Sequence, residues 1–509
     1  MGTGRRTSLT ARDARADRGK GASRAATSRP KGPPRAASGR VAPLYKRLPH
    51  GPHRLEREEV VLNQRTRIHG AMVESVARRG YEGTSVKQVI GLAGVSRRSF
   101  YEQFANKEEC FLVTFDLLVR RDIKRLRQTY LAADGSALER ARAAFQRFAE
   151  MAGSDRNAII LVVLEAQRAG AAGVLRLRQA AGACEQMLAR SFAESPDAVA
   201  LPTPIVRGIV GGLHGIASTF LREARAEAEP AAEAANVEHT ARSKQARVEL
   251  AKELLDWTLL FQTPAAEGMA ERMAPALTAR MRELSSAHGH RLGGVEAPSR
   301  DDRTRVLQGM LRLVTRDDYR SLSAPQIAEE ANVSVDRFCA LFADKQECFL
   351  SALDMIGDEL LEIAADPDLI GDDWPRAVRR VLGELMRFFA DHPLYTRMLA
   401  QEAFFGGAEA MEHTVELSQS IATLLTEGAP QQARSRHTID AIAGAIWHTV
   451  RCQVAGGRVE LLAALSDHLT YIVLAPYIGA EAAVEIVTEE REERRPSRVA
   501  DATGAPQSM

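Results

Sequence analysis

Apolar residues return every three to four positions along most of this chain, a spacing that places them on one face of a helix. The spacing is clearest at Ile68, Met72 and Val76, and again at Val306, Met310 and Val314. No convincing stretch alternates apolar and polar residues as a half-buried strand would. The pattern predicts an all-α protein.

An internal repeat sets the domain organisation. A helix-turn-helix pattern is written twice, 238 residues apart and without a gap. Identity at many fixed offsets indicates a duplication, which predicts two tandem units. The identical pairs are Tyr81 and Tyr319, Ser85 and Ser323, Gln88 and Gln326, Ala93 and Ala331, Val95 and Val333, Ser96 and Ser334, Phe100 and Phe338, Phe104 and Phe342, Ala105 and Ala343, Lys107 and Lys345, Glu109 and Glu347, Cys110 and Cys348, Phe111 and Phe349, and Leu112 and Leu350.

Segments rich in Ala, Leu, Arg and Glu follow each copy, as expected for amphipathic helices that pack in a bundle. A linker is expected where Pro and Gly gather, between about residues 264 and 302. The predicted domains are a disordered basic tail (1–57), a first helix-turn-helix domain (58–118), a first helical body (119–264), the linker (265–299), a second, degenerate helix-turn-helix domain (300–360), a second helical body (361–486) and a disordered tail (487–509).

Charge is unevenly distributed along the chain. The net charge is +2, but residues 1–57 hold fifteen Lys and Arg against three acidic residues. Such a stretch buries too little apolar surface to fold. We interpret it as a solvated tail or an over-long start of the reading frame, with a basic arm along DNA phosphates as the alternative.

Several classes of protein are disfavoured by what the chain lacks. No apolar run approaches the ~18 residues that span a bilayer, and no apolar stretch follows the N-terminal charges as in a secretory signal. No nucleophile elbow, phosphate loop or recognisable carboxylate pair is present. We therefore expect a cytoplasmic protein that is not an enzyme, with no membrane segment, metal or cofactor. The five cysteines lack metal-like or redox-like spacing: Cys110, Cys184, Cys339, Cys348 and Cys452.

The first copy has the chemistry of a DNA-reading element. Thr84 or Ser85 can cap its first helix and Ser96 its second, because a side-chain oxygen satisfies a free backbone N–H. Gly94 suits the left-handed turn between them. The apolar positions that fix the angle between the helices are Val89, Ala93, Val95, Phe100 and Phe104. The outward positions, which would face the major groove, are Arg97, Arg98, Ser99, Tyr101 and Gln103.

Residues 62–112 resemble the N-terminal domain of the tetracycline-repressor-like (TetR) family of bacterial transcriptional regulators. The resemblance is carried by Gly80-Tyr81-Glu82-Gly83-Thr84-Ser85, Ala93-Gly94-Val95-Ser96, Phe100-Tyr101, and Phe104 with Lys107-Glu108-Glu109. It implies that Tyr101, Lys107 and the hydroxyl of Thr84 or Ser85 contact phosphates, and that Arg97, Arg98 and Ser99 lie over bases. The expected DNA-binding set, within a motif at 85–104 and its flanks, is Thr84, Ser85, Ser96, Arg97, Arg98, Ser99, Tyr101 and Lys107.

The resemblance also implies partners. Family bodies are helical, enclose a small molecule and dimerise through their last two helices. The expected partners are therefore double-stranded operator DNA, a small hydrophobic or amphipathic effector whose binding residues the sequence does not give, and a second body. The expected setting is the bacterial cytoplasm, with the protein on the nucleoid when it is bound to DNA.

The second copy departs from the first where DNA would be read. Arg97-Arg98-Ser99 becomes Val335-Asp336-Arg337, and Tyr101 becomes Cys339. Residues 62–112 carry eight basic and five acidic residues, net +3, whereas residues 300–350 carry eight and nine, net −1. Because phosphate neutralisation supplies most non-specific affinity, we expect weak or no DNA binding here. The residues left for a weak contact are Ser323, Ser334, Arg337 and Lys345.

Small residues recur on one helical face in each body and predict a close helix–helix seam. The alternative is tight packing inside one bundle. The stripes are Gly208, Gly211, Gly212 and Gly215 in the first body, and Ala441, Gly444 and Ala445 in the second. Nearby, His214, Trp447 and His448 are more often core residues than ligands of an effector.

Two questions stay open at this point. The stripes pair either between two chains, giving a homodimer, or within one chain, giving a pseudo-dimer; we favour the homodimer because isologous dimers are common. The function is a transcriptional regulator, most simply a ligand-responsive repressor. The alternative is a degenerate tandem protein that acts through protein partners with little DNA specificity.

Overall fold

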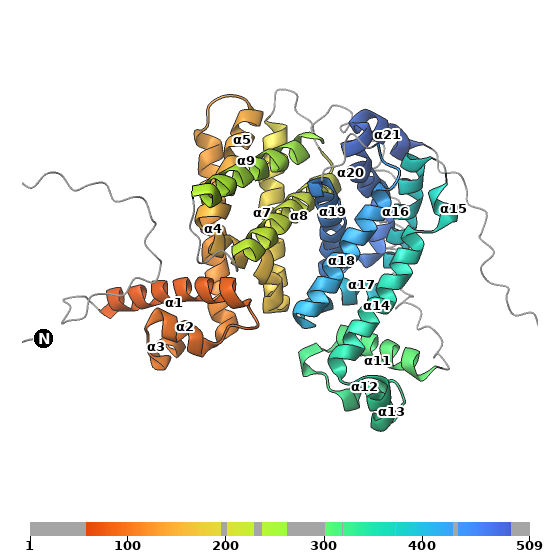
Figure 1. Cartoon of the computed structure of the whole chain (residues 1–509), viewed down its shortest axis with the longest axis horizontal. Helices are drawn as coiled ribbons and strands as arrows, with labels where there is room; N and C mark the ends of the chain where they lie inside the picture. Colours follow the sequence, from red (N-terminus) through yellow and green to blue (C-terminus); the bar gives the residue numbers. More distant parts are fainter. Residues whose placement is uncertain are drawn as a thin grey trace, which may run out of the picture. The chain divides into compact units, whose positions relative to one another are not determined.

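The computed structural model describes residues 57–194, 201–228, 237–261, 301–317, 319–371, 373–430 and 436–489. These residues form helices joined by loops, with no strand among them, so the all-α prediction is confirmed (Figure 1). The predicted linker (265–299) and nearly all of the predicted N-terminal tail lie outside the described residues. The last helix reaches Thr488, so the second body extends slightly beyond the predicted limit of 486.

The first half, residues 57–261, begins with the helices of the first helix-turn-helix and continues into a helical body. Its elements are α1 (Arg57–Arg79), α2 (Val86–Ala93), α3 (Arg97–Tyr101), α4 (Lys107–Ala132), α5 (Ala137–Ser154), α6 (Arg156–Ile160), the π-helical segment η1 (Leu161–Glu165), the 3₁₀ turn η2 (Ala166–Ala169), α7 (Ala171–Ala193), α8 (Thr203–Ala228) and α9 (Val237–Leu259).

The second half, residues 301–489, starts with a similar order of helices. Its elements are α11 (Asp302–Arg316), η4 (Tyr319–Ser321), α12 (Ala324–Glu330), α13 (Val335–Leu341), α14 (Lys345–Ala364), α15 (Pro367–Ile370), α16 (Trp374–Asp391), α17 (Pro393–Ala400), η5 (Glu402–Phe404), α18 (Gly407–Thr426), α19 (Arg436–Ala455), η7 (Val459–Leu465), α20 (Ser466–Ile478) and α21 (Ala480–Thr488).

Equivalent side chains begin the long helix that follows each helix-turn-helix. Asn106 accepts a hydrogen bond from the backbone N–H of Glu109 at 2.8 Å and starts α4. Asp344 stands at the equivalent position, accepts from the N–H of Glu347 at 2.9 Å, and starts α14. The same local chemistry therefore sets the same helix boundary in both halves.

Two apolar cores organise the described residues. The first helix-turn-helix has its own core, centred on Phe100, Phe104 and Phe111, which are at most 1% exposed. A larger core runs through both bodies and the second helix-turn-helix. Phe261 and Tyr471 contact one another in it, with ring centroids 5.8 Å apart, so apolar packing continues from one half to the other.

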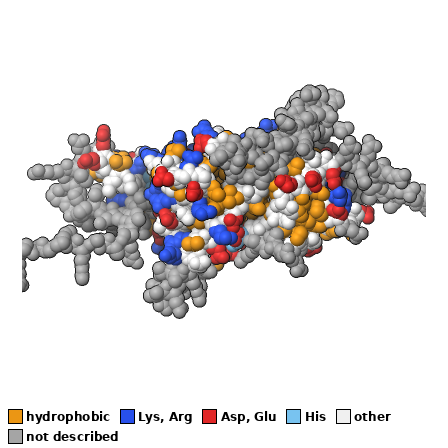
Figure 2. Space-filling view, turned by 90° about the horizontal axis from the view of Figure 1, so that it is seen from above, with side chains coloured by type: hydrophobic (Ala, Val, Ile, Leu, Met, Phe, Trp, Pro, Cys, Tyr) orange, Lys and Arg blue, Asp and Glu red, His pale blue; other side chains and the backbone are white. Residues whose placement is uncertain are grey.

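Two segments, Thr203–Ala226 and Val459–Ile478, are long and apolar enough to cross a bilayer by length and composition. This corrects the expectation that no run comes near that length. About two thirds or more of each segment (67% and 72%) is buried against other parts of the chain, as in the central helices of a bundle. On the face shown in Figure 2, basic and acidic side chains are interspersed among apolar ones.

Candidate nucleic-acid interface and ligand cavity

Local chemistry fixes where the helices of the first helix-turn-helix begin. Ser85 caps α2, and the side chain of Gln88 accepts in return from the Ser85 backbone N–H at 2.8 Å. The chain leaves α2 at Gly94, whose φ of 62° lies in the left-handed region. Ser96 accepts from the N–H of Ser99 at 3.0 Å and starts α3. The predicted caps and turn are confirmed, with Ser85 rather than Thr84 as the first cap.

Helix α3 presents its polar side chains outward. Arg97 and Arg98 are exposed, and Tyr101 is 45% exposed, which is high for a large aromatic residue. The Arg97 guanidinium lies 5.6 Å from the centre of the Tyr101 ring, and Arg98 Nε lies 2.9 Å from Glu102 Oε1. An exposed ion pair contributes little to stability, so Arg98 can exchange this partner for an acceptor on DNA at small cost.

Two of the residues expected to contact phosphates make hydrogen bonds within the domain. Thr84 is 2% exposed and donates its hydroxyl to the Gly80 carbonyl at 2.8 Å, so the expectation for this residue is wrong: its hydroxyl is not available to a phosphate. Lys107 Nζ donates to the Tyr81 carbonyl at 3.0 Å and lies 4.1 Å from the Tyr81 ring centre. Burial, with the nearby Arg320 charge, lowers the pKa of Lys107. Lys107 thus ties the loop before α2 to α4.

The second helix-turn-helix has the same local geometry and a different surface. Ser323 and Ser334 stand at the N-caps of α12 and α13. Asn332 has a φ of 52° at the position of Gly94, and Asn tolerates this region better than most residues. Arg337 Nε is 2.7 Å from Asp302 Oδ2, while Lys345 Nζ donates to the Leu322 carbonyl at 2.9 Å. The two basic side chains expected to give a weak contact therefore bind groups within the domain.

The small-residue stripes lie against each other within one chain. Helices α8 and α19 make the most extensive helix–helix contact in the described residues (Figure 1). A Cβ atom at Gly211 would lie 2.6 Å from the Gly444 carbonyl oxygen, and one at Gly215 would clash with the Asp440 carbonyl. Glycine is thus required by close backbone approach. Gly212 was expected to belong to the seam, and this expectation is wrong. Its Cα faces the Trp257 ring of α9, inside the first half.

This packing bears on the choice between a homodimer and a pseudo-dimer. A homodimer through the stripes would need each one exposed to a second chain, but the surfaces of α8 and α19 are already buried against each other. Ala441 and Ala445 are completely buried on α19. The pairing observed is the intramolecular one.

A cavity of about 310 Å³ opens inside the first body. Its walls come mainly from α4, α5, α7, α8 and α9. The short segments α6, η1 and η2 and one end of α19 also contribute. Most of the lining is apolar, including Phe145 and Phe148 of α5.

One end of the cavity is polar. Arg451 of α19 donates to Gln167 Oε1 at 3.0 Å, and Arg178 of α7 donates to the Ala455 carbonyl at 3.0 Å. Burial lowers the pKa of Arg451 to about 10, so its side chain is still a cation at neutral pH. His214 lies 3.2 Å from the Val163 carbonyl, and burial lowers its pKa to about 3, which keeps it neutral.

The sequence offered three candidates for contact with an effector, His214, Trp447 and His448, and two of them line this cavity. His214 and His448 lie in its wall. Trp447 instead donates to the Thr414 carbonyl at 3.3 Å and packs with Phe389, in the core of the second half. Which face of a helix borders a cavity depends on tertiary packing, so the sequence had no means of separating them.

A buried carboxylate connects the cavity wall to the first helix-turn-helix domain. Glu165, the last residue of η1, has a side chain that is only 1% exposed. It accepts from the Tyr81 backbone N–H at 2.9 Å, and Arg225 of α8 neutralises it at 3.0 Å. Val162 and Val163, in the same π-helical turn, line the cavity. Sequence inspection missed Glu165 because nothing marks one glutamate among many.

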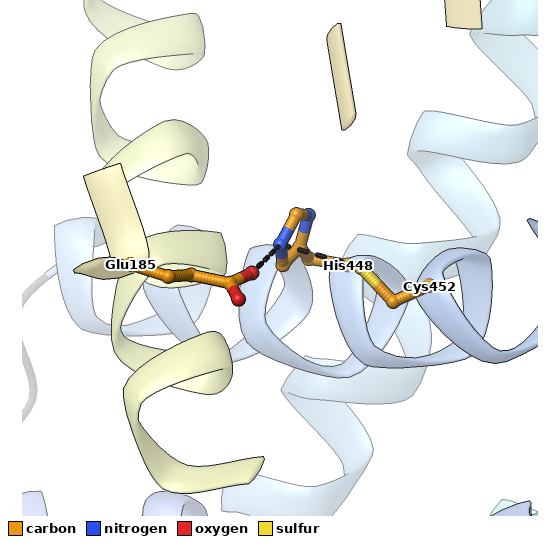
Figure 3. Close-up of side chains that lie close together, drawn as sticks. All are labelled: Glu185, His448 and Cys452. Carbon is orange, nitrogen blue, oxygen red and sulfur yellow. Dashed lines mark hydrogen bonds and ion pairs between the residues drawn. The ribbon is translucent and has the colours of Figure 1, made fainter. Parts of the chain in front are cut away.

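A second polar cluster lies where α7 meets α19. Glu185 Oε1 is 3.3 Å from His448 Nε2, and Cys452 Sγ is 3.6 Å from the same nitrogen (Figure 3). Burial raises the pKa of the Cys452 thiol, but the His448 hydrogen bond and the charges of His448 and Arg207 outweigh it, and the net pKa falls below the usual value. The His448–Cys452 spacing of four residues was a readable signal; Glu185, 263 residues away, was not.

These features define a class of protein. A capped helix-turn-helix with two exposed arginines at the start of its second helix is a DNA-binding domain. Residues 70–114 match the profile described as "Bacterial regulatory proteins, tetR family". The chain is also 27% identical over 161 residues to the HTH-type transcriptional repressor KstR of Mycolicibacterium smegmatis, a match that covers 30% of this chain and 76% of that protein. Residues 70–114 therefore carry the DNA-binding domain of a TetR-type transcriptional regulator.

Solved structures of regulators are also similar to part of this chain. The fatty acid degradation regulator FadR of Bacillus halodurans matches 38% of this chain and 94% of its own, with 17% identity and a TM-score of 0.31. FadR of Bacillus subtilis, solved in complex with stearoyl-CoA, matches 38% and 96%, with 17% identity and a TM-score of 0.29. These likenesses are low, and no conclusion is drawn from them.

Proposed function

We propose that this protein is a ligand-responsive transcriptional repressor, in which α3 reads the operator and occupancy of the cavity releases it. The observation that carries the proposal is the position of η1. This segment contributes Val162 and Val163 to the cavity wall and, through Glu165, holds the backbone of Tyr81 at the entrance to the DNA-reading head. The bacterial cytoplasm is the setting that this function requires.

The proposed DNA contacts follow from which side chains are free to turn outward. Arg97 and Arg98 stand at the N-terminal end of α3, the part of a recognition helix that reaches base edges, and arginine can donate two bonds to guanine. Ser99 lies beside them. The exposed hydroxyls of Ser85 and Tyr101 are suited to phosphates. Ser96 caps α3, and the helix N-terminus there favours an anion.

The cavity favours an amphipathic effector. Its long apolar wall suits a hydrocarbon or ring body, and Arg451, Arg178 and Gln167 gather at one end. A buried arginine is best satisfied by a carboxylate or another anionic acceptor. We therefore propose a hydrophobic molecule with an anionic head group.

Release of DNA requires that the effector bind the DNA-free conformation more tightly than the DNA-bound one. In the proposed mechanism, a molecule pressing on Val162 and Val163 shifts η1, and Glu165 carries that shift to Tyr81. Segments of π-helix are frequent at functional sites because their backbone can rearrange locally. Arg225 connects the same carboxylate to α8, the seam helix.

We further propose that the chain is a tandem of two TetR-like units whose bodies pair as the two subunits of a dimer would. The seam is formed by α8 and α19, with Gly208, Gly211, Gly215, Ala441, Gly444 and Ala445 at the contact. The pseudo-dimer carries one strong and one weak head, so the operator is expected to be asymmetric. The domain boundaries expected from the sequence stand as part of this proposal.

A second candidate function is an interaction protein that acts through protein partners. The second head favours it, because Val335 is 44% exposed where the first head carries Arg97. An exposed apolar side chain beside Asp336 suits a protein surface better than a phosphate backbone.

Selection of bound fragments from the source genome, followed by fluorescence anisotropy at fixed salt, separates the two candidates. Changing Arg97 and Arg98 together to Ala is expected to weaken operator binding by about 1–3 kcal/mol for each arginine. The matched variant, Asp336→Ala with Arg337→Ala on α13, should bind nearly as well as the parent. Equal losses in both variants would contradict the proposed reading head, and failure to enrich any fragment would favour the interaction protein.

A further inference from the structure

Three potential metal ligands converge where the two halves meet. His448 and Cys452 are four residues apart on α19, so they lie on one face of the helix, and Glu185 faces them from α7 (Figure 3). A carboxylate oxygen of Glu185, an imidazole nitrogen of His448 and the sulfur of Cys452 all lie within 4.8 Å of one another. The side chains of Glu185 and His448 are 16% and 17% exposed, and Cys452 is buried.

The same histidine nitrogen faces both other groups. Nε2 of His448 lies 3.3 Å from Glu185 Oε1 and 3.6 Å from Cys452 Sγ. A neutral imidazole nitrogen offers either one hydrogen or one lone pair, so Nε2 cannot make a full hydrogen bond to each. A single cation placed between the three atoms satisfies all of them at once.

The two separations that involve His448 Nε2 match those around a tetrahedral ion. Zinc binds imidazole nitrogen and carboxylate oxygen at about 2.0–2.1 Å and thiolate sulfur at about 2.3 Å, which puts nitrogen and oxygen about 3.3 Å apart and nitrogen and sulfur about 3.5 Å apart. The donor set also selects the metal, because thiolate and imidazole suit zinc-type ions rather than magnesium or calcium. The ligand atoms of Glu185 and Cys452 lie within 4.8 Å of each other, so binding an ion requires them to approach by at most about 1.3 Å.

We propose that Glu185, His448 and Cys452 form a zinc-type metal site that links the two halves of the chain. The carboxylate and the thiolate balance the two positive charges of the ion. Arg207 lies 3.6 Å from Glu185 Oε1 and orients the carboxylate, as outer partners of metal ligands do. His448 and Cys452 also line the cavity, so the fourth coordination position opens towards it.

Metal binding to the full-length, reduced and chelator-stripped protein tests the site. Titration with Co²⁺ should give the intense visible bands of a tetrahedral ion and a sulfur-to-cobalt charge-transfer band, saturating at one ion per chain. Zn²⁺ should displace the cobalt and raise the Tm, because the ion joins α7 to α19. Cys452→Ser should remove the charge-transfer band, and Glu185→Gln should weaken Zn²⁺ binding by about tenfold or more.

Cys184→Ser is the matched control. Cys184 lines the same cavity and precedes Glu185, but it is not one of the three converging residues. This variant should still bind one ion with the charge-transfer band intact. If Cys452→Ser fails to fold, Glu185→Gln and His448→Asn carry the test by affinity. Wild-type binding no tighter than that of these variants, or loss of the band in Cys184→Ser alone, would overturn the proposal. Neither result depends on DNA binding.

Discussion

Residues that are identical in the two copies of the repeat hold each domain together. Lys107 and Lys345 both donate to backbone carbonyls of the loop before the helix-turn-helix. Glu109 and Glu347 each accept from a backbone N–H four residues earlier, at the turn into the long helix. The positions that differ, at the start of α3 and α13, point outward. Retention of Lys345 is therefore a sign of folding and gives no support to DNA binding by the second head.

At the residue scale, Glu165 is expected to couple the effector to DNA. Glu165→Gln keeps the shape of the side chain but removes the charge that Arg225 neutralises and that Tyr81 N–H binds. We expect the effector still to raise the Tm of the variant while its effect on operator affinity falls sharply. Thermal shift and anisotropy on the same samples measure the two effects separately.

The matched control is Glu150→Gln on α5, because Glu150 is exposed and pairs with Arg147 at the surface. Its effector response should equal that of the parent protein. A Glu165→Gln variant whose DNA affinity still responds fully to the effector would rule out this connection.

At the element scale, the α8–α19 contact depends on glycine. Gly211→Ala is expected to lower the free energy of unfolding by about 1–3 kcal/mol, because the new methyl group overlaps backbone atoms of α19. Gly383→Ala, in the interior of α16 with open space around its Cα, should instead stabilise by up to about 1 kcal/mol through helix propensity. Denaturant unfolding of both variants gives the comparison, and an equal gain in both would show that the seam is not closely packed.

Helix α7 allows the cavity to be filled without touching the seam. Ala181 lines the cavity, so Ala181→Phe should occupy part of its space and abolish stabilisation by the effector. The neighbouring Gly182→Ala adds a methyl group where no atom lies within 4 Å, and should keep the effector response. Isothermal titration measures both. Unchanged effector affinity in Ala181→Phe would place the effector elsewhere.

At the scale of the whole molecule, the intramolecular seam predicts the molecular mass of the protein in solution and the symmetry of its operator. Because α8 and α19 are each other's partner, the protein should have the mass of one chain in light scattering at micromolar concentration. Its footprint should cover an asymmetric site, since the two heads present different side chains. A mass of two chains with a palindromic footprint would favour an assembly through another surface.

The sequence by itself determined the all-α class, the helix-turn-helix pairs, their caps and the left-handed turn at Gly94. These features depend on local rules: helical periodicity, side-chain capping and backbone sterics act within a few residues. The loss of basic residues from the DNA-facing surface of the second copy was also predictable from its residues alone. The N-cap residue fixes where a recognition helix begins, and the outward-facing positions follow from helical spacing.

Other features depended on the tertiary structure alone. They are the pairing of the two small-residue stripes, the cavity with its polar end, the burial of Thr84, and the cluster formed by Glu185, His448 and Cys452. Each is a contact between segments far apart in the chain. Such contacts depend on how amphipathic helices rotate and pack, and a stripe of glycines fits a partner within the chain as well as one outside it. The burial of α8 against α19, rather than any motif, pairs the two stripes within the chain in this structure.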